Sequence, residues 1–195
     1  MFARKSSLEY LGKNNLIKLA AILAIIGGAI TLVSIMWDAG MHVIREPETF
    51  WSIQHIAVYS GVSLIVSSAI LGFAILIKYQ CNRQVSIGIK FLIAGAATLI
   101  ASGYADSISH EVFGNGELVS IPHIFLESSP ALGVFGSFIL LKEIPSRKLK
   151  RLLPISKIIT FLAIMSIAFN LIIVFGGEIL CIAVYDLLSG GCAIL

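Results

Sequence analysis

Residues 37–55 read WDAGMHVIREPETFWSIQH, and residues 105–123 read ADSISHEVFGNGELVSIPH. In each stretch an aspartate is followed by a histidine four positions later and by a second histidine thirteen positions after that. The two copies are offset by 68 residues and contain all four histidines of the chain. They are Asp38, His42 and His55 in the first copy, and Asp106, His110 and His123 in the second. The repeated spacing indicates that these residues act together.

The composition predicts a membrane protein. Of the 195 residues, 57% are hydrophobic and 13% are charged, whereas soluble domains have about 25% charged residues. The apolar runs are continuous and reach the roughly 20 residues that a helix needs to cross a bilayer. The sequence therefore predicts an all-α, polytopic transmembrane helical bundle that forms a single membrane domain over residues 1–195. The net charge of +3 comes with no soluble basic domain, so we expect a lipid bilayer and no nucleic acid as partner.

Five spans are expected after a polar lead at residues 1–14. The predicted helices cover residues 15–41, 52–77, 86–111, 121–141 and 157–175. The first two form a helical hairpin over 15–77, the next two form a second hairpin over 86–141, and a basic linker at 142–156 leads to the C-terminal region, 157–195. Gly176 and Gly177 are expected to interrupt the fifth helix, because glycine disfavours helix interiors. Residues 178–195 then either extend that helix or form a sixth.

The basic residues predict the orientation of the chain. In a five-helix topology, thirteen of the fourteen Lys and Arg residues fall on one side of the membrane, and only Arg45 falls on the other. Because Lys and Arg are enriched in cytoplasmic loops, we expect the N-terminus in the cytoplasm of a cell-membrane protein. Both Asp/His/His patterns then lie near the extracytoplasmic face.

The 68-residue repeat extends beyond the aspartates and histidines. The same offset relates Gly27 to Gly95 and Ser60 to Ser128. Both hairpins would enter the membrane from the same side, which is the arrangement of parallel repeats related by an axis along the membrane normal. We interpret residues 15–141 as a duplicated two-helix hairpin.

The spacing in each hairpin is suitable for metal binding. An aspartate and a histidine at i and i+4 share one helix face, and the returning helix brings the second histidine to a similar depth. Two imidazoles and one carboxylate are ligands for copper, iron or zinc. The pattern is compatible with two metal sites or with one site built from both hairpins. Glu127, one turn after His123, and Tyr59, its counterpart in the first hairpin, are candidates to orient the imidazoles, as outer carboxylates do.

Two other interpretations remain for these residues. The polar groups can simply hold helices together, although an ionisable residue in a membrane span is by default a functional hypothesis. A haem held between paired histidines would not need the two aspartates, and their regular position argues against it.

The segments WDAGMH…QHIAVYSG and ADSISH…IPHIFLESS resemble a histidine-bearing membrane subunit of the particulate methane and ammonia monooxygenases. The resemblance covers roughly residues 20–140. That family usually has an asparagine where this chain has Asp106. The resemblance implies copper at both Asp/His/His sets, a complex with other membrane subunits, and O2-dependent hydroxylation of a small apolar or ammonia-like substrate. A non-catalytic membrane protein that binds or transports metal is the alternative.

Overall fold

The computed structural model describes the backbone of residues 2–43, 51–113 and 121–180, and within these ranges the side chains of 12–38, 40–41, 51–105, 107–108, 124–169 and 171–172. The helices are α1 (Phe2–Val43), α2 (Ile53–Lys78), α3 (Arg83–Phe113), α4 (Ile121–Glu143), the 3-10 helix η1 (Leu149–Leu152) and α5 (Leu153–Leu180). No strand occurs in these described ranges. The prediction of an all-α fold is confirmed.

Each α-helix contains a segment that is long and apolar enough to cross a bilayer. These segments are Gly12–Asp38, Ile53–Lys78, Arg83–Ala105, Ile124–Glu143 and Leu149–Phe169. In lipid a helix satisfies every backbone polar group within its own segment, so such runs fold as helices. The described part of the chain is therefore a five-span helical membrane bundle, as the sequence predicts.

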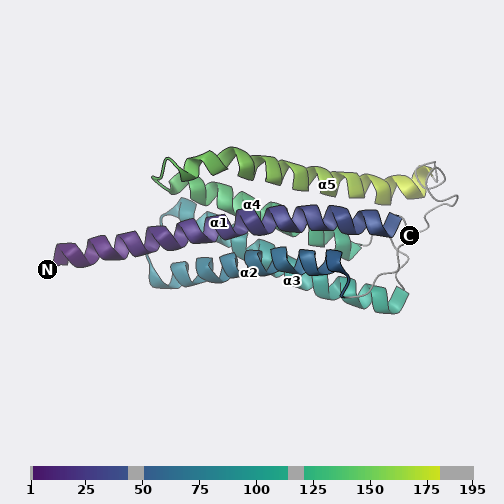
Figure 1. Ribbon diagram of the computed structural model, residues 1–195, viewed down its shortest axis with the longest axis horizontal. Helices are drawn as coiled ribbons and strands as arrows, with labels where there is room; N and C mark the ends of the chain where they lie inside the picture. The colour runs from purple at the N-terminus through teal and green to yellow at the C-terminus, as the bar shows by residue number, and fades with distance from the viewer. Residues whose placement is uncertain (1, 44–50, 114–120, 181–195) are drawn as a thin grey trace.

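Four helices form a ring, and the fifth lies outside it. Each of α1, α2, α3 and α4 packs against the next, and α4 closes the ring by packing against α1. Successive helices run in opposite directions, and α5 packs mainly against α4 (Figure 1). Consequently α1 with α2 and α3 with α4 form two antiparallel hairpins, as the 68-residue offset requires.

Two helix crossings occupy matching positions in the two hairpins. A Cβ atom added at Gly27 would lie 2.8 Å from the carbonyl oxygen of Gly61, and one added at Gly95 would lie 2.9 Å from the carbonyl oxygen of Ser129. Adding 68 to 27 and to 61 gives 95 and 129. Small residues allow such close backbone approach, which drives helix packing in lipid. The shared geometry supports the interpretation of these hairpins as a repeat.

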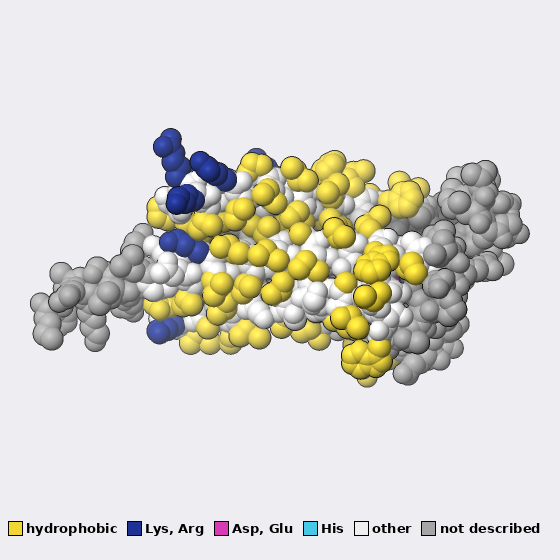
Figure 2. Space-filling view, in the orientation of Figure 1, with side chains coloured by type: hydrophobic (Ala, Val, Ile, Leu, Met, Phe, Trp, Pro, Cys, Tyr) yellow, Lys and Arg dark blue, Asp and Glu magenta, His cyan; other side chains and the backbone are white. Residues whose placement is uncertain are grey.

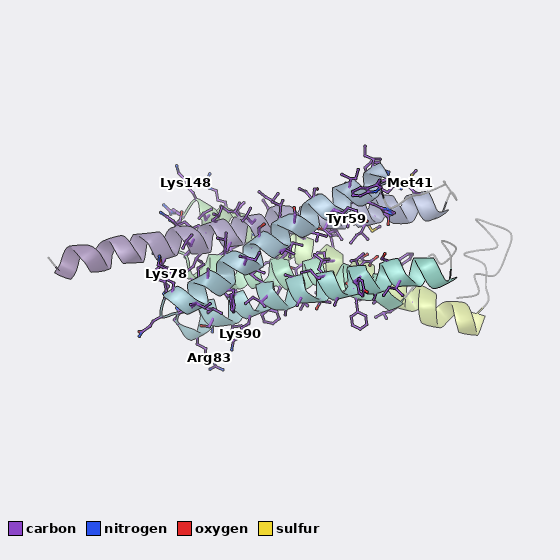
Figure 3. All side chains as sticks on the ribbon, turned by 90° about the horizontal axis from the view of Figure 1, so that it is seen from below. Met41, Tyr59, Lys78, Arg83, Lys90 and Lys148 are labelled. Atoms are coloured by element: carbon purple, nitrogen blue, oxygen red, sulfur yellow. The ribbon has the colours of Figure 1, made fainter. Side chains whose placement is uncertain are left out.

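The two ends of the bundle differ in charge. Figure 2 shows the visible Lys and Arg side chains gathered at one end, and Figure 3 labels Lys78, Arg83, Lys90 and Lys148 there. We call this the basic end. Tyr59 and Met41 lie toward the opposite end (Figure 3), which we call the Asp38 end because Asp38 lies one turn before Met41 in α1. The separation supports the topology predicted from the basic residues.

The interior differs between the two ends as well. Near the basic end, fully buried Ile and Leu side chains fill the ring: Ile75, Ile89, Leu92, Leu140 and Leu141. Toward the Asp38 end, buried polar side chains from all four ring helices join the apolar core: Thr31, Ser34, Asp38, Gln54, Ser102, Glu127 and Ser129. Polar atoms in the half that contains the predicted ligands are consistent with a site there, and the apolar half provides no polar path toward the basic end.

Three predicted boundaries differ from the structure. The polar lead at residues 1–14 is helical from Phe2 onward and continues α1 beyond the other helices (Figure 1). The predicted linker is shorter, because η1 begins at Leu149 and α5 at Leu153. Gly176 and Gly177 do not interrupt α5, which continues to Leu180. A glycine pair removes side chains but no backbone hydrogen bonds, so a helix tolerates it. The question of a sixth helix falls on residues 181–195, outside the described ones.

Candidate functional site

The first hairpin brings Asp38 and His55 together. Asp38 lies near the C-terminal end of α1, and His55 lies in the first turn of α2, where the Ile56 N–H donates to the Ser52 carbonyl at 3.0 Å. The Oδ1 atom of Asp38 lies 3.0 Å from the Nε2 atom of His55. Their side chains are 12% and 23% exposed, respectively. The prediction that these two residues converge across the hairpin is confirmed.

The 3.0 Å separation fits two chemical arrangements. In one, the carboxylate holds the Nε2 side of the imidazole and leaves Nδ1 to bind a metal ion, as carboxylates do for ligating histidines. In the other, both atoms bind one ion: ligand bonds of about 2.0–2.2 Å at a right angle place their donors about 3 Å apart. Without a metal ion, the same contact links α1 to α2.

His42, the third residue of this set, lies in the last turn of α1, four residues after Asp38. Its side chain lies outside the described residues. The helical backbone from Asp38 to Val43 keeps the i to i+4 relation, which puts both residues on one helix face. The backbone therefore agrees with the predicted arrangement, and the position of the imidazole stays a prediction.

The second set has its backbone described and its side chains outside the described residues. Asp106 and His110 belong to α3, and His123 is the third residue of α4. Asp38 and His55 occupy the corresponding places in α1 and α2, and the Gly27 and Gly95 crossings match. The convergence of Asp106, His110 and His123 remains a prediction that follows from the repeat.

Glu127 joins three helices. Its Oε2 atom accepts a hydrogen bond of 2.8 Å from the Ser166 hydroxyl of α5, and the same hydroxyl lies 3.8 Å from the Met36 sulfur of α1. Glu127 itself is buried in α4. The role predicted for this carboxylate, orienting the imidazole of His123, is not tested because that side chain lies outside the described residues.

Sequence reasoning did not identify Ser166. It is a single hydroxyl in an apolar helix and it lies 39 residues from its partner. The only signal in the sequence was the buried acid at Glu127, which needs a hydrogen-bond donor in an apolar environment, without an indication of which helix supplies it.

Tyr59 lies beside the imidazole of the first set. The centroids of the His55 and Tyr59 rings are 6.4 Å apart, with an angle of 43° between their planes. The two residues are one turn apart on α2, and 37% of Tyr59 is exposed. The ring therefore covers one side of His55. A hydrogen bond from the Tyr59 hydroxyl to a ligand stays a prediction.

Among the described side chains, no three His, Cys, Asp or Glu residues lie close enough together to hold a metal ion. This result does not include four of the six predicted ligands, since their side chains fall outside that set. Comparisons with protein-family models, with curated proteins and with solved structures found no match. The resemblance to the particulate monooxygenases therefore rests on the residues of the two Asp/His/His segments.

Proposed function

We propose that this is a metal-binding membrane protein in which Asp38, His42 and His55 bind a copper ion near the extracytoplasmic face. The observation that supports the proposal most strongly is the 3.0 Å contact between Asp38 and His55. The two residues are far enough apart in sequence that only the predicted hairpin brings them together. An acid in a membrane span is costly to keep there, and the contact gives it a partner.

The second hairpin is proposed to bind an equivalent ion through Asp106, His110 and His123. The matching crossings at Gly27 and Gly95 support an equal geometry for the two sets. Where the resemblance implies an asparagine, this chain has Asp106, so both sets have the same donors. We therefore expect two sites of similar affinity.

The donor types support copper as the first metal to test. Imidazole binds copper, zinc and iron well, and a set of two histidines and one carboxylate leaves open coordination positions. When bound, copper would supply O2 activation for hydroxylation of a small apolar or ammonia-like substrate. The chain itself supplies the ligands, an orienting carboxylate and an interior closed to water toward the basic end by Ile75, Ile89 and Leu92. Iron and zinc are the alternatives for the same donors.

The test is copper binding by purified protein in lipid nanodiscs. We expect stoichiometric copper in the wild type and a fall in affinity of at least about 100-fold at the first site in His55→Ala, because even residues that only orient ligands contribute about 10–100-fold. Asp38→Asn, which keeps the shape of the side chain, should also lower the affinity. Oxygen uptake with ammonia or a small alkane then distinguishes a monooxygenase from a protein that only binds or transports copper.

Ser63→Ala is the matched control. Ser63 lies on α2, two turns after His55, and its hydroxyl donates to the carbonyl of Ser60 in the same helix at 2.7 Å. This variant should bind copper as the wild type does. A wild type that holds no stoichiometric copper, iron or zinc would contradict the proposal, and Asp38 and His55 would then be a link between helices.

A further inference from the structure

Two lysines from different helices lie over one aromatic ring at the basic end. The Lys142 ammonium of α4 is 5.4 Å from the centroid of the Phe138 ring, and the Lys157 ammonium of α5 is 5.5 Å from it. Cations are attracted to the face of an aromatic ring at such distances. The ring therefore holds two positive charges beside the α4–α5 contact, although they repel each other.

Below these charges lies an aromatic surface. The Phe135 and Phe138 rings are stacked with centroids 6.2 Å apart, and Phe91 of α3 meets Phe135 edge-on at 5.1 Å. Phe135 is 38% exposed, and Phe161 of α5 is 60% exposed. The outer side of α4, between α3 and α5, thus presents apolar rings to the bilayer and ammonium groups at its edge.

The positive charge of this region is not neutralised by the protein. Lys142, Lys157 and the exposed Arg147, Lys148, Lys150 and Arg151 form no ion pair with any acidic side chain that the structure describes. The nearby Glu143 carboxylate accepts a hydrogen bond of 2.9 Å from the Asn82 amide. A negatively charged ligand is therefore the complement of this edge.

We propose that Lys142 and Lys157 bind the phosphate of an anionic phospholipid, whose acyl chains lie on Phe135, Phe138 and Phe161. Basic groups between transmembrane helices on the cytoplasmic side are suited to anionic headgroups. The apolar surface directly beneath the two ammonium groups favours a lipid over a free phosphate, because it matches both parts of a phospholipid. This site is independent of the metal-binding proposal and lies at the other end of the bundle.

The test measures binding of phosphatidylglycerol and phosphatidylcholine with identical acyl chains to the full chain in detergent, by native mass spectrometry. The wild type should prefer phosphatidylglycerol. Each surface lysine contributes a factor of about 5 in binding to anionic lipid, so Lys142→Gln/Lys157→Gln should weaken phosphatidylglycerol binding about 25-fold. Binding of phosphatidylcholine should not change. Phe138→Leu, which removes the ring between the charges, should reduce the preference as well.

The control removes two exposed charges elsewhere on the basic end. Lys78 also lies over a ring, at 5.5 Å from Tyr79, and Arg83 lies on the side of the bundle away from Lys148 (Figure 3). Lys78→Gln/Arg83→Gln should keep phosphatidylglycerol binding within about threefold, since screening limits charge effects to roughly 8–10 Å. Equal loss in both double variants, equal wild-type affinity for the two lipids, or displacement of the lipid by inorganic phosphate at the same concentration would each overturn the proposal.

Discussion

Replacing Gly61 by alanine should open the crossing that brings Asp38 and His55 together. A Cβ atom at Gly61 would contact the Thr31 hydroxyl, and would lie 2.7 Å from the Thr31 nitrogen and 2.9 Å from the Gly27 carbonyl oxygen. Ordinary contacts are about 3.5 Å or longer, so α1 and α2 must separate by roughly 0.6–0.8 Å at this point. Overpacking of this kind costs about 1–3 kcal/mol.

Gly40→Ala provides the comparison for stability. Gly40 is also in a helix, and a Cβ atom there would have no neighbour within 4 Å. Both substitutions gain the same helix propensity, about 1 kcal/mol, so the difference between them isolates the cost of the contact. Reversible unfolding in mixed micelles measures the free energy of unfolding of each variant. Gly61→Ala should be less stable than Gly40→Ala by about 1–3 kcal/mol.

The consequence for the site follows from the same displacement. Gly61 lies six residues after His55, and Thr31 lies seven before Asp38, so separation at the crossing also lengthens the 3.0 Å contact. Gly61→Ala should therefore bind copper more weakly than the wild type. Equal stability of the Gly61 and Gly40 variants would refute the reasoning, since it would mean that the two helices do not approach as closely as the structure shows.

Two further predictions concern the packing of the bundle. Ser166→Ala leaves the buried Glu127 carboxylate without this hydroxyl donor and should lower the free energy of unfolding by about 1–3 kcal/mol; Ser128→Ala, whose hydroxyl donates only to its own helix at Phe125, should have a smaller effect, and the reverse order would show that the link to α5 is unimportant. Leu92→Ala creates a cavity at a fully buried position and should cost about 2–5 kcal/mol in the same unfolding assay, and a cost below about 1 kcal/mol would contradict the close packing near the basic end.

The fold was predictable because apolar runs of sufficient length have few alternatives in a bilayer. The approach of Asp38 and His55 was predictable for a related reason: a short connection between two long helices returns the chain to the same depth. What composition does not specify is where a helix stops when no proline intervenes. Residues 1–14 contain none, so α1 extends through them to Phe2.

Contacts between distant helices were not predictable from one sequence. The bond from Ser166 to Glu127 depends on α5 packing against α4, and the placement of Lys157 and Lys142 over one ring depends on the same contact. Neither pair has a sequence spacing that identifies it. The two hairpins, in contrast, carry their pairing in a repeated spacing, which is why two members of the candidate site were identified in advance.

The most direct test of the metal-binding account is electron paramagnetic resonance of the protein loaded with Cu(II), which detects imidazole nitrogens bound to the ion. The account predicts two imidazole nitrogens per copper in the wild type, and one at the first site after either His42→Ala or His55→Ala. A spectrum without imidazole nitrogen, or one that both substitutions leave unchanged, would contradict it.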